Sequence, residues 1–378
     1  MSMKRKLLNN LKNIPGWRTS DKLVVFAVDD YGNVRLDSAE ARDRMIAAGL
    51  DMPGRFDRLD ALETRQDLEA LFDVLSSVVD GNGNGAVFTP YTLSANPDFE
   101  AIATRKNGYS YESLSQSFER LAETQASAYE GAWAAWMEGV RLGLLRPQFH
   151  GREHLNVELF ERKLRDGSHA VKVSIANRSM VALGDETSMP GVGFTHAFGL
   201  WDRSEVENHR EIIEDGLQLF ERTFGFPSTT FTPPAQKIHP DLYPYLESLG
   251  IRGIFKPRWC SRRIDRQHQV REVNLSERKR HHRHVSLVRN VVFEPTDSDS
   301  LDSVQMALDQ VAAAFRWRRP AMISSHRVNF CGHIDEKNRT HGLATLKQLL
   351  RGIVERWPDV QFISTDQLVE RIVPTQDD

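Results

Sequence analysis

Short apolar runs of strand length alternate with amphipathic segments of helical length along most of this chain. The strand-like runs lie at residues 23–29, 86–89, 147–150, 229–232, 251–255, 286–294, 321–326 and 360–364. Helical patterns between them include residues 64–79, 109–145, 203–224, 302–317 and 343–357. Strands that alternate with helices indicate βαβ units and a parallel sheet. We therefore predict an α/β fold, an irregular (β/α) barrel of about seven to eight parallel strands.

The barrel pattern begins after a short basic segment. Residues 1–20 are expected to form a helical extension, and residues 21–378 a single domain, since this length suits one barrel with insertions. No stretch approaches the roughly 18 apolar residues of a membrane span. Polar residues interrupt the start of the chain where a secretory signal would be apolar. These features predict a cytoplasmic protein.

Composition narrows the possible functions. Lys and Arg number 49 against 52 Asp and Glu, a net charge of −3, so no overall positive field favours nucleic acid. The sequence contains neither G-x-G-x-x-G nor a P-loop, which argues against a dinucleotide or P-loop site. Cys260 and Cys331 are the only cysteines and lack metal-type spacing. A reduced protein is the simplest interpretation.

Candidate chemistry lies at the ends of the predicted strands. Asp29 and Asp30 close the first apolar run, and two adjacent carboxylates there need a cation, a catalytic use or hydration at a surface turn. His150 closes another run, and His154 lies four residues later, on one helical face or across a strand-to-helix turn, where both can reach one ion. One carboxylate and two imidazoles leave coordination positions open for water and substrate, as a catalytic zinc needs.

Two further strand ends carry a histidine or a rigid turn. His326 closes the run at 321–326, and Pro233, Pro234 and Ala235 follow the run at 229–232. The prolines fix the backbone direction and could aim a backbone N–H at a developing oxyanion. A buried structural histidine and a plain strand terminator are the simpler alternatives. Because parallel strands in a barrel end on one face, the four features are expected to converge.

These sequences, in this order, resemble the motifs of the NodB-like polysaccharide deacetylases, metal-dependent carbohydrate esterases on a distorted (β/α) barrel. Val28-Asp29-Asp30-Tyr31-Gly32 resembles T-F-D-D-G with one residue inserted, and His150-Gly151-Arg152-Glu153-His154 resembles H-S/T-x-x-H. Thr232-Pro233-Pro234-Ala235 aligns with R-x-P-Y/F, and Ile323-Ser324-Ser325-His326 aligns with the closing apolar-pair histidine motif. The resemblance spans roughly residues 23–370.

The resemblance implies a barrel of the glycoside hydrolase/deacetylase type with a divalent metal, Zn²⁺ being the expected ion. Asp30, His150 and His154 would be its ligands, Asp29 the general base and His326 the general acid. The backbone N–H of Ala235, after Pro234, would support the oxyanion. The implied activity is removal of acetyl groups from N- or O-acetylated sugar units of a polysaccharide or its precursor, so the expected partner is a carbohydrate.

The sequence also departs from the family pattern. Thr232 stands where the family has the arginine that orients the base, and Arg152, Arg327 and Arg35 are the candidates to replace it. Arg152 and Arg327 are also expected near the substrate. Ala235 stands where the motif has an aromatic residue. The long interval between Asp30 and His150 predicts a helical insertion at about 91–146.

Other functions remain open. Related barrels hydrolyse cyclic amides, and a barrel that has lost activity, as the missing arginine would allow, could bind a glycan or a partner protein. The basic residues between 258 and 284 could hold an anionic glycan, a sugar-linked diphosphate or a lipid headgroup, which would allow peripheral membrane contact. A solvated loop is the simpler interpretation of that stretch.

Overall fold

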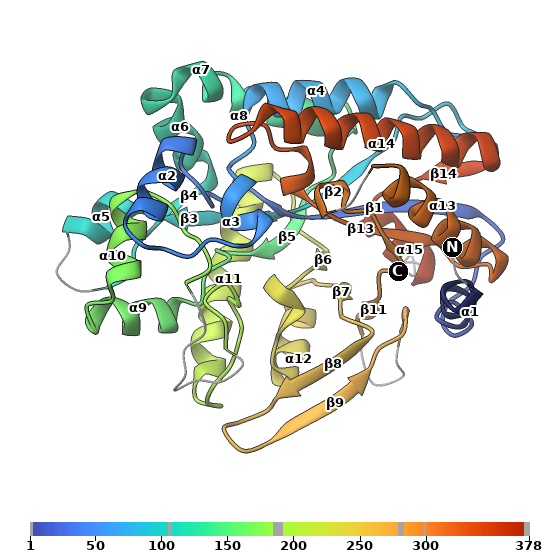
Figure 1. The fold of residues 1–378 in the computed structure, drawn as a ribbon. Coiled ribbons are helices and arrows are strands. Elements are labelled where there is room, and N and C mark those ends of the chain that lie inside the picture. Colours follow the sequence, from blue (N-terminus) through green and yellow to red (C-terminus); the bar gives the residue numbers. More distant parts are fainter. Residues whose placement is uncertain (1–2, 105–107, 184–191, 279–282, 298–299, 374–378) are drawn as a thin grey trace.

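Figure 1 shows the computed structural model, which describes residues 3–104, 108–183, 192–278, 283–297 and 300–373. A curled sheet forms its centre, with helices around it. The strands of this sheet are β1 (Lys22–Tyr31), β2 (Phe88–Leu93), β5 (Gln148–Gly151), β6 (Thr230–Phe231), β7 (Gly253–Phe255), β10 (Glu277–Arg278), β11 (Val285–Leu287), β12 (Val291–Val292), β13 (Ala321–His326) and β14 (Val360–Phe362). Two antiparallel ribbons lie outside it, β3 (Ala95–Pro97) with β4 (Tyr111–Ser113), and β8 (Trp259–Arg263) with β9 (Gln269–Val273).

Eight strands run parallel in the order β11-β7-β6-β5-β2-β1-β13-β12, while β14 adds a parallel partner to β1 and β10 an antiparallel partner to β11. This curled parallel sheet forms a half-barrel and confirms the predicted irregular (β/α) barrel. The helices are α1 (Met3–Leu11), α2 (Ala39–Ala47), α3 (Arg55–Leu59), α4 (Arg65–Ser76), α5 (Phe99–Thr104), α6 (Leu114–Thr124), α7 (Ala126–Tyr129), α8 (Ala132–Arg141), α9 (Val157–Arg165), α10 (His169–Ala176), α11 (Glu205–Phe224), α12 (Tyr243–Ser248), α13 (Ser300–Arg316), α14 (Glu336–Arg356) and α15 (Thr365–Ile372).

The first strand, β1, is buried on both faces. Leu23 and Val25 belong to an apolar cluster shared with β7, β11, β13 and α15. The alternate residues Val24 and Phe26 belong to a larger cluster with α4, α8, α13 and α14. Successive side chains of a strand point to opposite faces, and a parallel strand covered on both faces has apolar residues throughout. This explains the uninterrupted apolar run that ends at Asp29.

A short crossing joins the two edges of the parallel sheet. The stretch 286–294, expected to be one strand, is divided into β11, which pairs with β7, and β12, which pairs with β13. Because Leu287 and Val291 are four residues apart, they lie within about 14 Å of each other. Asn290 ties the crossing to β13, since its N–H donates to Met322 O (3.2 Å) and its Oδ1 accepts from Met322 N (2.8 Å). The crossing therefore draws the sheet into its curled form.

The segments outside the parallel strands complete the helical layer. α1 packs on α13, and β1 begins at Lys22. The interval between β2 and β5 contains α5, α6, α7 and α8 with the β3–β4 ribbon, but β2 continues to Leu93, so the first residues of the expected interval 91–146 belong to the sheet. α8 packs against α4 with Trp136 fully buried, and α4 also lies beside α14 (Figure 1). Among the described residues, no helix is long and apolar enough to cross a bilayer.

Candidate active site

Asp29 and Asp30 enter the same pocket because β1 is distorted at its end. Asp29 lies in register with His326 of the neighbouring strand β13. The pairing of β1 with β2 shifts between Val28 and Tyr31, and Asp30 has a left-handed backbone with φ 75°. Neighbouring residues of a regular strand point to opposite faces, and the bulge removes that alternation. Both aspartates therefore line one pocket of about 350 Å³.

Buried polar side chains hold the turn that follows Asp30. The N–H of Gly32 donates to both carboxylate oxygens of Glu63 (3.1 and 3.3 Å). Asn96 donates from Nδ2 to Gly32 O (2.9 Å) and accepts at Oδ1 from Val34 N (2.8 Å). A non-glycine residue in a left-handed conformation is strained and persists only where its surroundings fix it. Glu63 and Asn96 provide that support.

Asp30, His150 and His154 have the arrangement of a metal-binding cluster. One potential ligand atom from each lies within 4.8 Å of the others. His150 stands in β5, and His154 stands in the turn before α9, so the pair spans a strand-to-helix turn. Oδ1 of Asp30 is 3.2 Å from His150 Nε2 and 3.1 Å from His154 Nε2.

The protonation of His150 supports a cation in this cluster. Its Nδ1 lies 2.6 Å from the carbonyl oxygen of Thr232, which can only accept, so Nδ1 carries the proton. This leaves Nε2, the nitrogen that faces Asp30, as the atom through which His150 would bind a metal ion. A carbonyl behind the ring is a common way to orient a ligand histidine. The three residues fit a divalent ion.

The pKa shifts of Asp30 and His154 also suit metal binding. Burial raises the pKa of Asp30, but the adjacent His154 and His150 outweigh it and hold the pKa well below its usual range. Burial lowers the pKa of His154 more than Asp30 raises it. An ionised carboxylate at Asp30 and a neutral imidazole at His154 are the protonation states in which these side chains bind metals.

Arg289 is the arginine that contacts Asp29. Its two terminal nitrogens donate to the two oxygens of Asp29, each at 2.5 Å, and its guanidinium packs 4.6 Å from the centre of the Phe255 ring. Nη2 also lies 3.4 Å from the hydroxyl of Thr232, the residue at the family's arginine position. Burial raises the pKa of Asp29, but Arg289 outweighs it, and the pKa is lowered overall.

The arginines considered from the sequence have other partners. Arg35 pairs with Asp57 at 2.6 Å. The other two form ion pairs with carboxylates away from Asp29: Arg152 with Glu153 (2.6 Å) and Asp215 (3.0 Å), and Arg327 with Asp60 and Glu63 (both 2.9 Å). Arg35 lines the pocket, whereas Arg152 and Arg327 are not among the described residues that line it. Arg289 was not predicted from the sequence; its charge inside the mostly apolar stretch 285–293 is the signal that could have identified it.

His326 forms an ion pair with Glu294, a residue that sequence reasoning also missed. Nδ1 of His326 lies 2.7 Å from Glu294 Oε1, and Nε2 lies 4.0 Å from Asp29 Oδ2. Burial lowers the pKa of His326, but Glu294 and the two aspartates outweigh it and raise the pKa to about 9. Arg55 (2.9 Å) and Asn329 (2.7 Å) fix the other oxygen of Glu294. The imidazole is thus kept protonated and oriented.

The double-proline turn forms another wall of the pocket. Pro234 is buried, and Ala235 and Gln236 follow with left-handed φ values of 54° and 52°. Pro233, Ala235 and Gln236 line the pocket, whereas Pro234 is not among the described lining residues.

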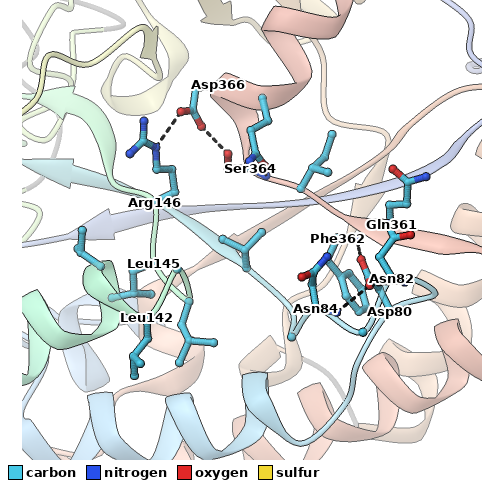
Figure 2. A pocket seen from close by; sticks show the side chains of 18 of the residues that line it. Asp80, Asn82, Asn84, Leu142, Leu145, Arg146, Gln361, Phe362, Ser364 and Asp366 are labelled. Atoms are coloured by element: carbon cyan, nitrogen blue, oxygen red, sulfur yellow. Dashed lines mark hydrogen bonds and ion pairs between the residues drawn. The ribbon is translucent and has the colours of Figure 1, made fainter.

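A larger cavity, of about 1010 Å³, lies away from this chemistry (Figure 2). Its walls include the segments that precede β2 and β5, at the opposite ends of the strands. Arg146 and Asp366 form an ion pair at one side (2.8 Å), and Asp80 accepts hydrogen bonds from the N–H groups of Asn82, Asn84 and Phe362 on the other. In (β/α) barrels the amino-terminal ends of the strands serve stability, and these satisfied contacts fit that role.

Comparison with known proteins gives a likeness of fold alone. No family model matches the chain, and no curated protein matches it significantly. Among solved structures, a "probable Polysaccharide deacetylase" from Pseudomonas aeruginosa PAO1 shares 9% identity, with 94% of each chain covered and a TM-score of 0.48. The Xyl-CE4 domain of a multidomain xylanase from the Trinervitermes trinervoides hindgut metagenome shares 11%, covering 93% of this chain and 91% of that one, at 0.38. A GH57-type branching enzyme from Pyrococcus horikoshii shares 8%, covering 95% and 71%, at 0.46.

Proposed function

We propose that this protein is a metal-dependent hydrolase that removes acetyl groups from N- or O-acetylated sugar units of a polysaccharide or its precursor. The observation that supports this proposal most strongly is that the cluster of Asp30, His150 and His154 lies in one pocket with Asp29 and His326. Asp29 is held by Arg289, and His326 is held by Glu294. A cluster of one carboxylate and two imidazoles is the donor set that a catalytic Zn²⁺ uses. The motif resemblance supplies the acetylated sugar as substrate.

Asp29 and His326 suit opposite proton transfers. When bound by Asp30, His150 and His154, Zn²⁺ would polarise the scissile carbonyl and acidify the attacking water. Asp29 accepts the proton of that water, because Arg289 keeps it ionised and each of its oxygens retains a second lone pair. His326, kept protonated by Glu294, donates its proton to the leaving amine or alcohol. The N–H of Ala235 supports the oxyanion.

Arg289 also bears on the binding-only alternative. That hypothesis rested on the loss of the arginine that orients Asp29 in the family pattern. Arg289 makes a two-point contact with Asp29 from another segment. This contact supports an active barrel over a binding-only one, and hydrolysis is the function that we propose.

Acetate release tests the proposal. The purified protein is incubated with a panel of acetylated glycans and nucleotide sugars after chelation and again after Zn²⁺ is restored. We expect release that chelation abolishes and Zn²⁺ restores, and near-stoichiometric metal in the wild type but not in His154→Ala. A metal-free protein that releases acetate equally well in the presence of chelator would contradict the proposal.

A further inference from the structure

A second cavity, of about 390 Å³, adjoins the candidate active site. The two share Ala235 and Gln236 as a common wall. From there the second cavity extends to residues of the β8–β9 ribbon. This ribbon projects from the lower side of the molecule in Figure 1. A substrate whose acetylated unit occupies the first pocket could therefore place its neighbouring unit in the second.

The charged lining of the second cavity is entirely basic. Lys237, Arg262 and Arg263 contribute to its walls, and the described residues that line it include neither Asp nor Glu. Arg262 also pairs with Glu272 of the adjoining strand β9 at 2.9 Å. Arg263 lies 4.6 Å over the ring of Trp201. Since the whole chain carries a net charge of −3, this is a local concentration of positive charge.

An exposed aromatic ring stands at the edge of the same cavity. Trp259 lines it and is 73% exposed, far more than is usual for a side chain of this size. Trp259 pairs with Val273 across the ribbon, and Val273 is itself 47% exposed. A flat apolar surface beside fixed cations is suited to a sugar ring that carries an anionic group.

We propose that this cavity is a subsite for an anionic sugar unit next to the acetylated one, with a carboxylate or a phosphate held by Arg262 and Arg263 and the ring placed against Trp259. The inference rests on the proposed function for the acetylated unit and adds the charge of the substrate. Guanidinium groups bind either anion through paired N–H donors.

Direct binding tests this subsite without relying on catalysis. Calorimetry on the full chain with Zn²⁺ compares three probes of equal length: a neutral N-acetylglucosamine oligosaccharide, one alternating N-acetylglucosamine with glucuronate, and a phosphorylated N-acetylglucosamine oligosaccharide. We expect tighter binding of at least one anionic probe, by about tenfold at low salt and less at high salt. The anionic probe that binds more tightly identifies the anion.

Variants test which residues cause the preference for an anionic probe. The double variant Arg262→Gln/Arg263→Gln should bind all three probes equally, whereas Arg271→Gln, at an exposed position of β9 that is not among the described lining residues, should retain the preference. Trp259→Ala should weaken all three, and it serves as a second test if the double variant does not fold. Equal affinity of the wild type for the three probes, or loss of the preference in Arg271→Gln, would overturn the subsite. A preserved binding preference without any acetate release would instead count against the proposed hydrolysis and leave the subsite standing.

Discussion

Asp29 and Asp30 are neighbours in sequence with different chemical surroundings. Asp30 faces two imidazoles at 3.1 and 3.2 Å, whereas Asp29 faces a guanidinium at 2.5 Å and an imidazole at 4.0 Å. Both pKa values are lowered despite burial, Asp29 chiefly by Arg289 and Asp30 chiefly by the histidines. One carboxylate is therefore suited to a metal and the other to a proton, although the residue type is the same.

Replacing Asp29 tests this division. Asn keeps the size of the side chain but cannot take up a proton, so Asp29→Asn should lower kcat by about 10²–10⁴-fold while the metal content stays that of the wild type. Asp43→Asn, at a site with a 67% exposed side chain, is the matched control and should leave both quantities unchanged. Full turnover in Asp29→Asn would remove Asp29 from the role of base.

The pH dependence tests His326. Its acid role requires the protonated ring, so activity should be present below the pKa of His326 and lost as the pH rises through it. That pKa is raised to about 9, and a bound dication will bring it down somewhat by repelling the imidazolium. Glu294→Gln removes the charge that raises the pKa, so the alkaline limb of kcat/KM should move to lower pH. Glu112→Gln on β4, which alters an ion pair with Arg120 of α6, should not move the alkaline limb. If the alkaline limb of Glu294→Gln stayed at the wild-type pH, His326 would not be the general acid.

At the scale of elements, the sequence predicted those site residues that lie close together along the chain. His150 and His154 lie four residues apart around one strand end, and Asp29 and Asp30 close an apolar run, so spacing and hydropathy were sufficient to select them as candidates. Arg289 contacts Asp29 across 260 residues. It belongs to a crossing that joins the two edges of the curled sheet, and its stretch resembled a single strand. β11 and β12 pair with different strands because of tertiary packing, which the local sequence pattern does not encode.

The turn after β1 should depend on its buried support. Glu63 accepts from Gly32 N, from Trp136 Nε1 (2.6 Å) and from Arg327 (2.9 Å). Removing one member of a buried ion pair leaves the other charge uncompensated, so Glu63→Ala should lower the free energy of unfolding by about 3–5 kcal/mol. Glu69→Ala, which breaks a surface pair with Arg65, should have a much smaller effect because exposed ion pairs contribute little. Chemical denaturation measures both, and equal effects would show that Glu63 does not support the turn.

At the scale of the whole molecule, the site joins parts of the chain that are far apart. Its members include residues at the ends of β1, β5 and β13, in the crossing before β12 and in the turn at η1 (Pro234–Gln236). The parallel sheet places these ends on one face, as the general rule for such barrels predicts. The half-barrel architecture thus explains why local motifs converged, and the crossing explains how a distant arginine joined them.

A metal ion at this position should stabilise the entire fold, because its ligands link β1 to β5 and to the turn that leads into α9. A ligand that binds only the folded state adds RT ln(1 + [L]/Kd), about 2.7 kcal/mol when Zn²⁺ is at a hundredfold excess over Kd. For a chain of this size the expected rise in Tm is a few degrees. Scanning calorimetry should show that rise in the wild type and not in His154→Ala, while His169→Ala, a histidine on α10 outside the cluster, should respond as the wild type does. A rise of equal size in His154→Ala would mean that Zn²⁺ acts elsewhere on the protein, and the assignment of the cluster as the metal site would fail.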